Sequence, residues 1–531
     1  MPSDSNQVPP DGFPDPLAVL RDSAWLRGIP GLADAAVEWH AALLPERDEL
    51  HGTADRLARP RFKPTLALRA GEVGLHAANA GRKIAYRRLS GDITGVEVAR
   101  DLRRAFEALG PTYIKLGQLL ASSAGLVPAD VADEFGKCRD AVPADDWDVV
   151  KGQLRRELGD IDAVFAEIDE APLASASIAQ VHAATLHDGR DVVVKVRHPR
   201  TRRRFYADIS IMAWSADLLE RISRVGIANP RAFVRLFARQ VVEELDLRLE
   251  ALNMCEIGAS IEHAGLDYVL CPRPLPDLVT SRVIVMERLD GIPYSAISEI
   301  RASGVDTERL VTLGIKAVLE GTFVYGVFHG DLHAGNLLVC PPDKFGLLDY
   351  GIVGRLSPGQ RLALVRFAFA VGSGDVRGQI EAMRAFDAFP AGADLEPMIT
   401  DLETHQERIE NELLAGAEDF ALDDLANAVA VVVDELGAHG FRMPPELALF
   451  SKNLLYLNSS ILTLAPRLDL TEALGPIMVS LAMRYGNLFI DVIQVDMGGV
   501  ARRDDIAHDV APRLRHGRLG HQLGGRAGLD D

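Results

Sequence analysis

A short polar segment in the second half of the chain constrains the fold more than any other feature. Residues 329–339, HGDLHAGNLLV, place Asp331 and Asn336 five positions apart in a loop that precedes a short apolar strand. A second acid, Asp349, follows 18 residues after Asp331 in the segment LLDYG. That separation suits a loop plus one β-hairpin, and Gly351 permits a tight backbone turn beside the second acid. The segment therefore predicts two acids and one amide at the ends of a hairpin.

This order of oxygen-bearing side chains suits phosphoryl transfer. The reaction uses a carboxylate near the attacking oxygen and oxygen ligands that hold Mg²⁺ against the phosphates. Kinase catalytic loops follow the same order, H-x-D-x-x-x-x-N, then a hairpin, then D-x-G. The alternative is a polar turn in which His, Asp and Asn only cap the backbone. Each element alone fits that alternative, but the three together favour a catalytic loop.

A lysine in a strand supports the same interpretation. Lys195 lies in DVVVKVRHP with Val on both sides, and a charged side chain at such a position needs a partner. In a kinase small lobe, a strand lysine holds phosphates and pairs with a glutamate on a helix. The candidate partners are Glu244, Asp246 and Glu250 in the following helical segment. An exposed edge lysine is the alternative, and the position of Lys195 ahead of Asp331 argues against it.

The phosphate loop departs from the ordinary kinase pattern. No G-x-G-x-x-G precedes the lysine strand, and the small residues Ala174, Ser175, Ala176 and Ser177 stand in its place. Alanine permits close approach of a phosphate but not the positive φ angles that glycine adopts. We therefore expect a stiffer loop and a different mode of nucleotide binding.

The pattern of elements predicts an α+β fold with two lobes. Apolar residues recur at helical spacing from about 19 to 110 and across 145–170, and two strands joined by a turn at 187–189 follow. A long helical stretch over 203–262 precedes a β-branched strand at 281–290. A helix over 306–326, the polar segment with its hairpin, and helices from 357 to 495 complete the chain.

Composition restricts the partners and the compartment. The chain of 531 residues carries a net charge of −19, which argues against a nucleic-acid partner. Its four cysteines are widely spaced, as in a protein of a reducing compartment. The N-terminus lacks a signal-peptide pattern, and no window of about 18 uninterrupted apolar residues occurs. We expect a cytoplasmic protein, or one that contacts the inner face of a membrane peripherally.

Several motifs in order resemble the UbiB/AarF (ADCK-type) atypical kinase family. They cover residues 95–360, and K-x-G-Q together with the Ala-rich loop distinguishes this family from ordinary protein kinases. In chain order the motifs are KLGQ at 115–118, the Ala-rich loop followed by SIAQVH, VVVKV around Lys195, ELD at 244–246, EALN from Glu250, VMERLDG at 285–291, HGDLHAGN and LLDYG.

The resemblance assigns roles to individual residues. Lys195 resembles the nucleotide-phosphate lysine with Glu250 as its partner, and Asp331 resembles the catalytic aspartate. Asn336 and Asp349 resemble the Mg²⁺ ligands, so ATP and Mg²⁺ are the expected cofactors. Glu287 falls in the hinge whose backbone would meet adenine. The expected K-x-G-Q contact set, in which the first two residues meet the last two, is Lys115, Gln118, Glu244 and Asp246.

The resemblance also implies domain limits. It predicts a two-lobed protein-kinase-like fold with an N-terminal K-x-G-Q helical extension and a C-terminal helical extension. The expected units are a flexible tail at 1–18, the N-terminal extension at 19–170, the N-lobe at 171–290, the C-lobe at 291–385, the C-terminal extension at 386–495 and a mobile tail at 496–531.

Three functions fit the sequence. The first is a slow Mg-ATP-dependent kinase or ATPase that supports isoprenoid quinone synthesis or membrane lipid homeostasis, with an isoprenoid or quinone-precursor lipid as a partner. The second is a non-catalytic, nucleotide-gated module that binds lipid or organises a complex. The third is a small-molecule kinase of the aminoglycoside or choline type, which shares the catalytic loop but gives no reason for KLGQ or the Ala-rich loop.

Overall fold

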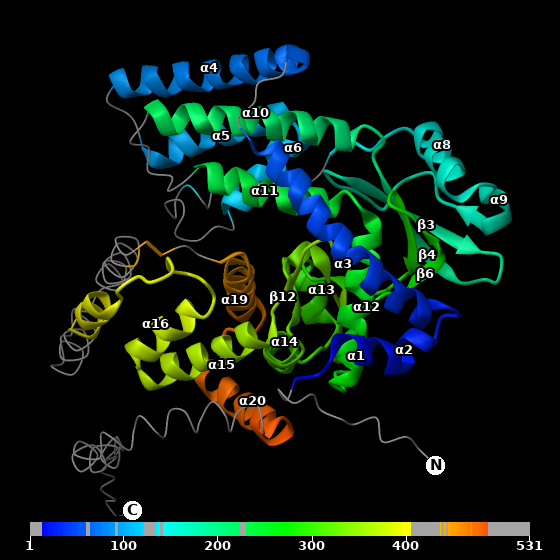
Figure 1. Ribbon diagram of the computed structural model, residues 1–531. Coiled ribbons are helices and arrows are strands. Elements are labelled where there is room, and N and C mark those ends of the chain that lie inside the picture. Colours follow the sequence, from blue (N-terminus) through cyan, green and yellow to red (C-terminus); the bar gives the residue numbers. More distant parts are fainter. Residues whose placement is uncertain are drawn as a thin grey trace, which may run out of the picture. The chain divides into compact units, whose positions relative to one another are not determined.

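The Val-rich segment around Lys195 forms an inner strand of a six-stranded sheet (Figure 1). The strand order is β1-β3-β4-β7-β6, with β2 paired to β3, and all of these pairs are antiparallel. Gly189, at φ 86°, turns the chain between β3 and β4 as the sequence predicts. The strands are β1 (Phe165–Ile168), β2 (Ala174–Ser175), β3 (Ala179–Leu186), β4 (Asp191–Arg197), β6 (Pro274–Val279) and β7 (Val283–Glu287).

This computed structural model describes most of the chain. The described residues are 13–59, 64–90, 94–121, 131, 134–138, 142–222, 230–404, 436, 440–441, 444–468 and 470–486. The predicted tail at 496–531 and most of the tail at 1–18 lie outside them, as does part of the predicted C-terminal extension.

The first sheet starts earlier in the chain than the sequence indicates. Residues 145–170 are predicted to be helical, and they form α8 (Trp147–Leu158) and α9 (Ile161–Val164), but then β1. Leu154 of α8 and Phe165 of β1 pack in one apolar cluster with Val192 and Val194 of β4. Strand β1 escapes prediction because its four residues, FAEI, are too few to show a period of two.

A second, four-stranded sheet carries the polar segment. Its order is β5-β11-β10-β8, and the predicted hairpin pairs Leu337 with Leu347 in antiparallel register. Strand β5 joins this sheet although it precedes β6 of the first sheet in sequence. A separate two-stranded sheet pairs β9 with β12. The strands are β5 (Val269–Leu270), β8 (Ile292–Pro293), β9 (Val327–His329), β10 (Leu337–Cys340), β11 (Lys344–Leu347) and β12 (Val353–Arg355).

The predicted helical stretch 203–262 is three helices rather than one. They are α10 (Thr201–Ile222), α11 (Pro230–Glu244) and α12 (Leu247–His263). Asp246 is the N-cap of α12, because its carboxylate accepts a hydrogen bond from the Arg248 N–H in the first turn. Helix α12 is buried along most of its length and contacts strands of both lobes, including β6, β7 and β9.

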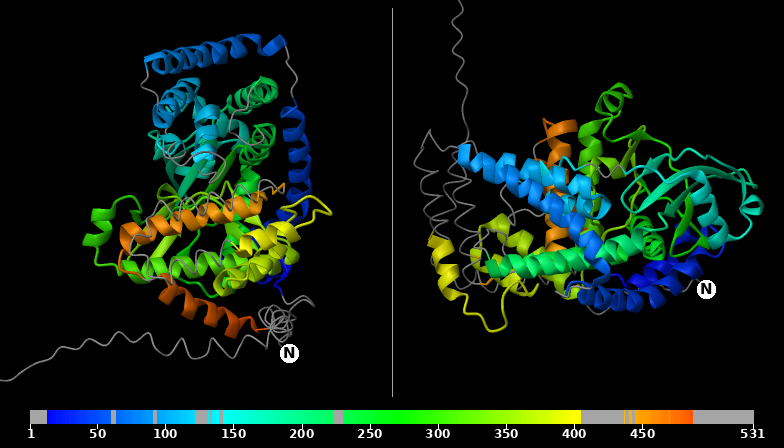
Figure 2. Two further views of the ribbon diagram at one scale, coloured as in Figure 1. Left: turned by 90° about the vertical axis from the view of Figure 1, so that its left-hand side faces the viewer. Right: turned by 90° about the horizontal axis from the view of Figure 1, so that it is seen from above.

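Helices from the N-terminal part pack against α10 to α12 (Figures 1 and 2). One apolar cluster joins Tyr113 and Leu116 of α6 to Phe205 of α10 and Phe237 of α11. The N-terminal helices are α1 (Pro16–Asp22), α2 (Ala24–Arg27), α3 (Leu32–Leu57), the 3₁₀ turn η1 (Pro64–Leu66), α4 (Ala67–Ser90), α5 (Gly95–Leu109) and α6 (Pro111–Ala121).

The remaining described helices lie between the strands of the second sheet in sequence or follow them. The predicted helix at 306–326 is α14, which continues as a π-helical turn. These helices are α13 (Ile297–Ala302), α14 (Thr307–Glu320), the π turn η2 (Gly321–Tyr325), the 3₁₀ turn η3 (Ala334–Asn336), α15 (Pro358–Ser373), α16 (Val376–Arg384), α19 (Pro445–Leu464) and α20 (Leu470–Arg484). Among the described helices, none is long and apolar enough to cross a bilayer.

The packing of α8 under the first sheet gives a stability prediction. Leu154 is fully buried, so Leu154→Ala should lower the free energy of unfolding by about 2–5 kcal/mol. Val149 lies on the same helix but is 42% exposed, so Val149→Ala should change it by less than about 1 kcal/mol. Chemical denaturation followed by circular dichroism measures both. Equal effects of the two substitutions would show that α8 is not part of the core.

Candidate nucleotide and metal site

The predicted site residues converge on one cleft between the two sheets. Its volume is about 1530 Å³. Its floor and walls include Lys195, Glu250, Asp331, Asn336 and Asp349. The Ala-rich loop (Ala174, Ser175, Ala176 and Ser177), Glu287, Lys115, Gln118 and Glu244 also line it. Asp246 is the one predicted site residue that is not in the lining.

A shared lysine forms the electrostatic centre of the cleft. Lys195 Nζ lies 2.6 Å from Glu250 Oε1 of α12 and 3.3 Å from Asp349 Oδ2. Burial would raise the pKa of Asp349, but the Lys195 ammonium and the Gly351 N–H lower it below its ordinary value. Burial raises the pKa of Glu250 despite the same ammonium. Asp349 is therefore an anion at neutral pH, and Lys195 is a cation beside it.

Helix α12 connects this centre to the segment after Asp349. Asn253, the last residue of EALN, donates from Nδ2 to the Tyr350 carbonyl at 2.6 Å and accepts from Arg355 Nη2 at 2.7 Å. Since Glu250 and Asn253 are one turn apart, a single face of α12 holds both Lys195 and the backbone beside Asp349. The sequence shows this spacing, but it does not show which carbonyl Asn253 binds.

His329 braces the two acidic loops against each other. Its Nδ1 accepts the Asp331 N–H at 3.0 Å, and its Nε2 donates to the Asp349 carbonyl. Burial lowers the pKa of His329, which keeps the ring neutral in the tautomer that these two bonds require. Both ring nitrogens are thus occupied by backbone groups, so His329 connects the two loops rather than binding a metal.

The oxygen atoms around Asp349 fit Mg²⁺. Asn336 donates from Nδ2 to the Asp331 carbonyl at 3.0 Å, which leaves Oδ1 as its ligand atom, and the Asn336 carbonyl accepts the Leu348 N–H at 3.0 Å. Within the described residues, no cluster of three His, Cys, Asp or Glu side chains would hold a metal alone. One carboxylate and one amide are a typical Mg²⁺ set when phosphate oxygens complete the shell.

The Ala-rich loop is held by its own backbone. The Ala176 N–H donates to the Ala179 carbonyl at 2.9 Å, and His198 Nε2 donates to the Ala176 carbonyl at 3.1 Å. Ser177 is 3% exposed. These hydrogen bonds fix the backbone of the loop, which a glycine-rich loop would leave more flexible. Residues 174–177 of the loop line the cleft.

Glu287 ends β7 at the junction of the lobes. Its carboxylate binds the Arg273 guanidinium at 2.7 and 2.8 Å, and its N–H donates to the Arg273 carbonyl at 3.0 Å. The Glu287 side chain is thus part of a structural ion pair. Met286 and residues 288–291 line the cleft beside it.

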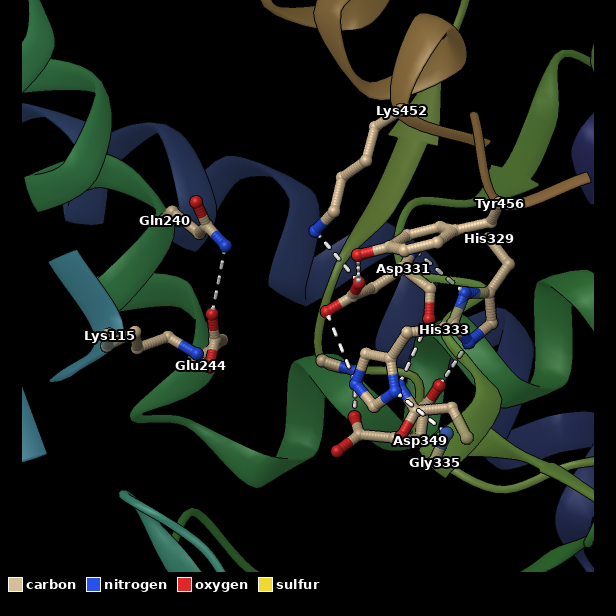
Figure 3. Close-up of polar contacts among 12 residues, drawn as sticks. Lys115, Gln240, Glu244, His329, Asp331, His333, Gly335, Asp349, Lys452 and Tyr456 are labelled. Atoms are coloured by element: carbon tan, nitrogen blue, oxygen red, sulfur yellow. Dashed lines mark hydrogen bonds and ion pairs between the residues drawn. The ribbon is translucent and has the colours of Figure 1, made fainter. Parts of the chain in front are cut away.

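The K-x-G-Q contact forms only in part (Figure 3). Lys115 Nζ of α6 lies 2.6 Å from Glu244 Oε2 at the end of α11, and Gln240 donates to the other Glu244 oxygen at 3.4 Å. Asp246 does not join this pair, since its carboxylate binds Arg248 at 2.7 Å and caps α12. Two residues, Leu245 and Asp246, separate Glu244 at the end of α11 from the first residue of α12, and the chain turns there.

The glycine of KLGQ has a packing role. A Cβ at Gly117 would lie 3.0 Å from both Cys138 Sγ and Phe135 Cδ1, so only glycine lets α6 approach these side chains without displacement. A Cβ at Gly351 would lie 3.1 Å from Asp349 Oδ1 and 3.5 Å from Glu244 Cγ. The Lys115–Glu244 pair is therefore a direct neighbour of the loop that carries Asp349.

Comparison with known proteins assigns the chain to a family. A family model described as the ABC1 atypical kinase-like domain matches residues 137–383. Two curated proteins of Mycobacterium tuberculosis, the uncharacterized proteins Rv0647c (strain H37Rv) and MT0675 (strain CDC 1551), are each 36% identical to this chain over 384 residues. These alignments cover 70% of this chain and 75% of each relative. The chain belongs to the ABC1 atypical kinase-like family.

This membership confirms the predicted fold class. The ABC1 chain has an α+β, two-lobed kinase-like fold, with the candidate cleft between its sheets. The family match begins after KLGQ, so α6 and the other N-terminal helices lie outside it.

The chain also aligns with two solved structures at low scores. The Rv3197–erythromycin complex of M. tuberculosis aligns with a TM-score of 0.43 and 21% identity over 66% of this chain and 87% of that one. The Rio2 kinase complex with ADP, Mg²⁺ and phosphoaspartate from Chaetomium thermophilum aligns with a TM-score of 0.23 and 16% identity over 67% and 98%. Scores this low support no conclusion about the ABC1 chain.

The structure adds three residues that the sequence interpretation missed. Lys452, Asn453 and Tyr456 of α19 contact the catalytic-loop segment in the ABC1 chain. In the sequence, Lys452 and Asn453 interrupt an otherwise apolar helical stretch. Two polar residues inside an apolar helical stretch were the available signal, but it does not identify their partners.

The shared lysine gives a second prediction. Lys195→Met removes the cation between two carboxylates and should cost about 3–5 kcal/mol of unfolding free energy near pH 7.5. The loss should shrink as the pH falls toward 4. Asp349 stays ionised over this range in the unmodified chain because its pKa is lowered. In the variant, Glu250, whose pKa burial already raises, takes up a proton as the pH falls, and this relieves the repulsion between the two carboxylates. Thermal melts between pH 4 and 8 measure the difference.

The double variant Lys195→Met with Glu250→Gln is the matched control. It removes one carboxylate along with the cation, so it should recover part of the loss at pH 7.5. A loss that is independent of pH, and that the second substitution does not reduce, would contradict the shared-lysine arrangement.

Proposed function

We propose that this ABC1 chain is a Mg-ATP-dependent atypical kinase or ATPase with slow turnover. One observation carries the proposal: Lys195, Asp331, Asn336 and Asp349 meet in a single cleft, with Asp349 held as an anion against the Lys195 ammonium. A cation for phosphates, two oxygen ligands for a metal and a carboxylate at the reacting end are the parts that phosphoryl transfer needs. A purely structural ion pair would explain Lys195 and Asp349, but it would not explain why Asp331 and Asn336 lie in the same cleft.

Each group has a distinct role in this proposal. Lys195 binds the α- and β-phosphates, and Glu250 orients it. Asn336 and Asp349 hold Mg²⁺, which neutralises charge on the β- and γ-phosphates when bound. Asp331 orients the attacking oxygen. The edge of the Ala-rich loop (residues 174–177) covers the phosphates, and the hinge backbone beside Glu287 meets adenine.

The N-terminal extension favours hydrolysis or a small acceptor over a protein acceptor. Helix α6 places Lys115 and Gln118 in the lining of the cleft, and the Lys115–Glu244 pair closes one side of it. A folded protein substrate would have to displace this pair to bring a hydroxyl to Asp331. We therefore expect modest ATPase activity and little phosphorylation of generic proteins.

The finer role follows the UbiB/AarF resemblance. The motifs KLGQ, the Ala-rich loop and EALN support that subtype, and it implies isoprenoid quinone synthesis or membrane lipid homeostasis, with a quinone-precursor or isoprenoid lipid as partner. The second candidate is a non-catalytic, nucleotide-gated module that uses the same cleft. The presence of every predicted metal and phosphate ligand favours the catalytic candidate.

Loss of the metal carboxylate tests the catalytic proposal. Asp349→Asn should reduce Mg-dependent ATP hydrolysis by about 100-fold or more, since it removes the anionic ligand of the metal. Asp343→Asn, the same change on the β10–β11 turn, should retain the full rate because Asp343 lies outside the cleft lining. Phosphate release in purified protein measures both.

Complementation separates the two candidates. If Asp349→Asn has no ATPase activity yet restores growth or quinone content to a deletion strain of the source organism, the non-catalytic candidate holds. Equal hydrolysis by Asp349→Asn and the unmodified chain would contradict the metal assignment itself.

The outer helix α4 supports a peripheral membrane contact. It lies against α5 and α10 (Figure 2), and its far side exposes Leu68 (93%), Leu75 (74%), Tyr86 (74%) and Leu89 (89%). Arg82 and Lys83 lie exposed between them. An apolar face bordered by cations fits an anionic lipid surface locally, although the chain as a whole carries a net charge of −19.

A vesicle assay tests this contact. Leu75→Glu combined with Leu89→Glu should reduce co-sedimentation with phosphatidylglycerol-rich vesicles by about fivefold or more, because charged side chains oppose insertion of the apolar face. Val149→Glu on α8 should leave co-sedimentation unchanged. Binding that survives the α4 double substitution would place the membrane contact elsewhere.

A further inference from the structure

Helix α19 brings three polar side chains onto the loop that carries Asp331, and Figure 3 shows two of them, Lys452 and Tyr456. Lys452 Nζ lies 2.8 Å from Asp331 Oδ1, and the Tyr456 hydroxyl donates to the same oxygen at 3.3 Å. Asn453, between them, donates from Nδ2 to the His329 carbonyl. These contacts join residues more than 120 positions apart in the sequence, and they all fall on one turn of the catalytic loop.

The Lys452–Asp331 pair is well shielded from solvent. The side chains of Lys452 and Asp331 are 13% and 22% exposed, and the Lys452 ammonium lies 5.6 Å from the centre of the Tyr456 ring. Burial would raise the pKa of Asp331, but Lys452 and His333 lower it. An ion pair with this little solvent screening is much stronger than a surface pair.

Lys452 places an ammonium group at the Asp331 end of the cleft. Among the described side chains, His333 is the second one within ion-pair distance of Asp331. Its Nε2 lies 3.9 Å from Asp331 Oδ2, and its Nδ1 accepts the Gly335 N–H. Lys195 is engaged with Glu250 and Asp349. Lys452 and Tyr456 line the same cleft as these residues.

We propose that Lys452 is a catalytic residue that α19 supplies to the kinase-like core, and that its ammonium binds the γ-phosphoryl oxygens of ATP beside Asp331. The proposal rests on the proposed function, because it needs ATP in this cleft. The catalytic aspartate lies where the attacking oxygen meets the γ-phosphorus, so a cation in contact with that aspartate is next to the transferred group. Lys195 then serves the inner phosphates and Lys452 the outer one.

The hydrolytic step balances with this assignment. The oxygen of a water molecule forms the new bond to the γ-phosphorus, and the bond to the β,γ-bridging oxygen breaks, with its electron pair leaving on ADP. The water proton passes to Asp331 and from there to solvent. Lys452 transfers no proton, and its charge stabilises the γ-phosphoryl oxygens throughout.

A pair of nucleotides separates a phosphate contact from a structural role. Isothermal titration calorimetry with Mg²⁺ compares ADP with the ATP analogue AMPPNP, on the full chain and on Lys452→Met. We expect ADP affinity within about twofold of the unmodified chain and AMPPNP affinity reduced about tenfold or more, since ADP lacks the γ-phosphate. Lys452→Arg should restore most of the AMPPNP affinity. Lys316→Met on α14, which is outside the cleft lining, should change neither affinity.

The same comparison in an Asp331→Asn background distinguishes direct from indirect action. A contact with phosphate persists when Asp331 is neutral, so adding Lys452→Met should still weaken AMPPNP binding selectively. Equal loss of ADP and AMPPNP affinity would assign Lys452 a structural role. Unchanged or tighter AMPPNP binding by Lys452→Met would make Lys452 an inhibitory counter-ion and overturn the proposal. Failure of the unmodified chain to bind either nucleotide would overturn the proposed function, and this inference with it.

Discussion

The arrangement of the cleft depends on Lys195, which two carboxylates share. One carboxylate, Glu250, comes from α12, and the other, Asp349, comes from the segment after the β10–β11 hairpin. The lysine itself lies on β4 of the first sheet. The contact thus joins three parts of the chain that are separated by 55 and 154 positions. Removing Lys195 leaves Glu250, whose side chain is 5% exposed, buried without a compensating charge, so β4 and α12 are held together at this point.

Helix α12 also contacts the segment after Asp349 in the second lobe. Helices that precede and follow the kinase-like core in sequence contribute side chains to the same cleft. His329 donates to the Asp349 carbonyl and Asn253 to the Tyr350 carbonyl, so both hold the backbone at and directly after Asp349. Helix α6 contributes Lys115 beside Glu244, and α19 contributes Lys452 beside Asp331. Glu244, Asp331 and the Glu250–Asp349 pair therefore each contact a lysine from a different element, α6, α19 and β4 respectively. Helices α6 and α19 therefore supply charged side chains to the cleft, in addition to packing against the core.

Much of the site could be predicted from the sequence because its residues lie in short motifs. HGDLHAGN and LLDYG fix the spacing of Asp331, Asn336 and Asp349, and the Val-flanked lysine required a partner, which the resemblance placed at Glu250. The choice among Glu244, Asp246 and Glu250 depended on the helix break at 245–246, which periodicity does not show. Asp246 caps α12 and Glu244 binds Lys115, so two neighbouring acids have unrelated roles.

Other features lay beyond the sequence signal for physical reasons. Strand β1 is four residues long, and pairing with β3 rather than its own pattern makes it a strand. The contact of Lys452 with Asp331 depends on how α19 crosses the catalytic loop, and a single sequence carries no record of such long-range packing. In the sequence, Gly117 is only one position of the KLGQ motif. The structure shows that a Cβ at this position would lie 3.0 Å from Phe135 Cδ1 and Cys138 Sγ.

The most direct test of this account is a crystal structure of the full chain with Mg²⁺ and AMPPNP. The account predicts one nucleotide in the cleft, with Lys195 on its inner phosphates and the metal between Asn336 Oδ1 and the Asp349 carboxylate. Nucleotide bound outside the cleft would contradict the central claim. So would nucleotide bound inside the cleft if Lys195 contacted only Glu250 and Asp349 and no metal lay at Asp349.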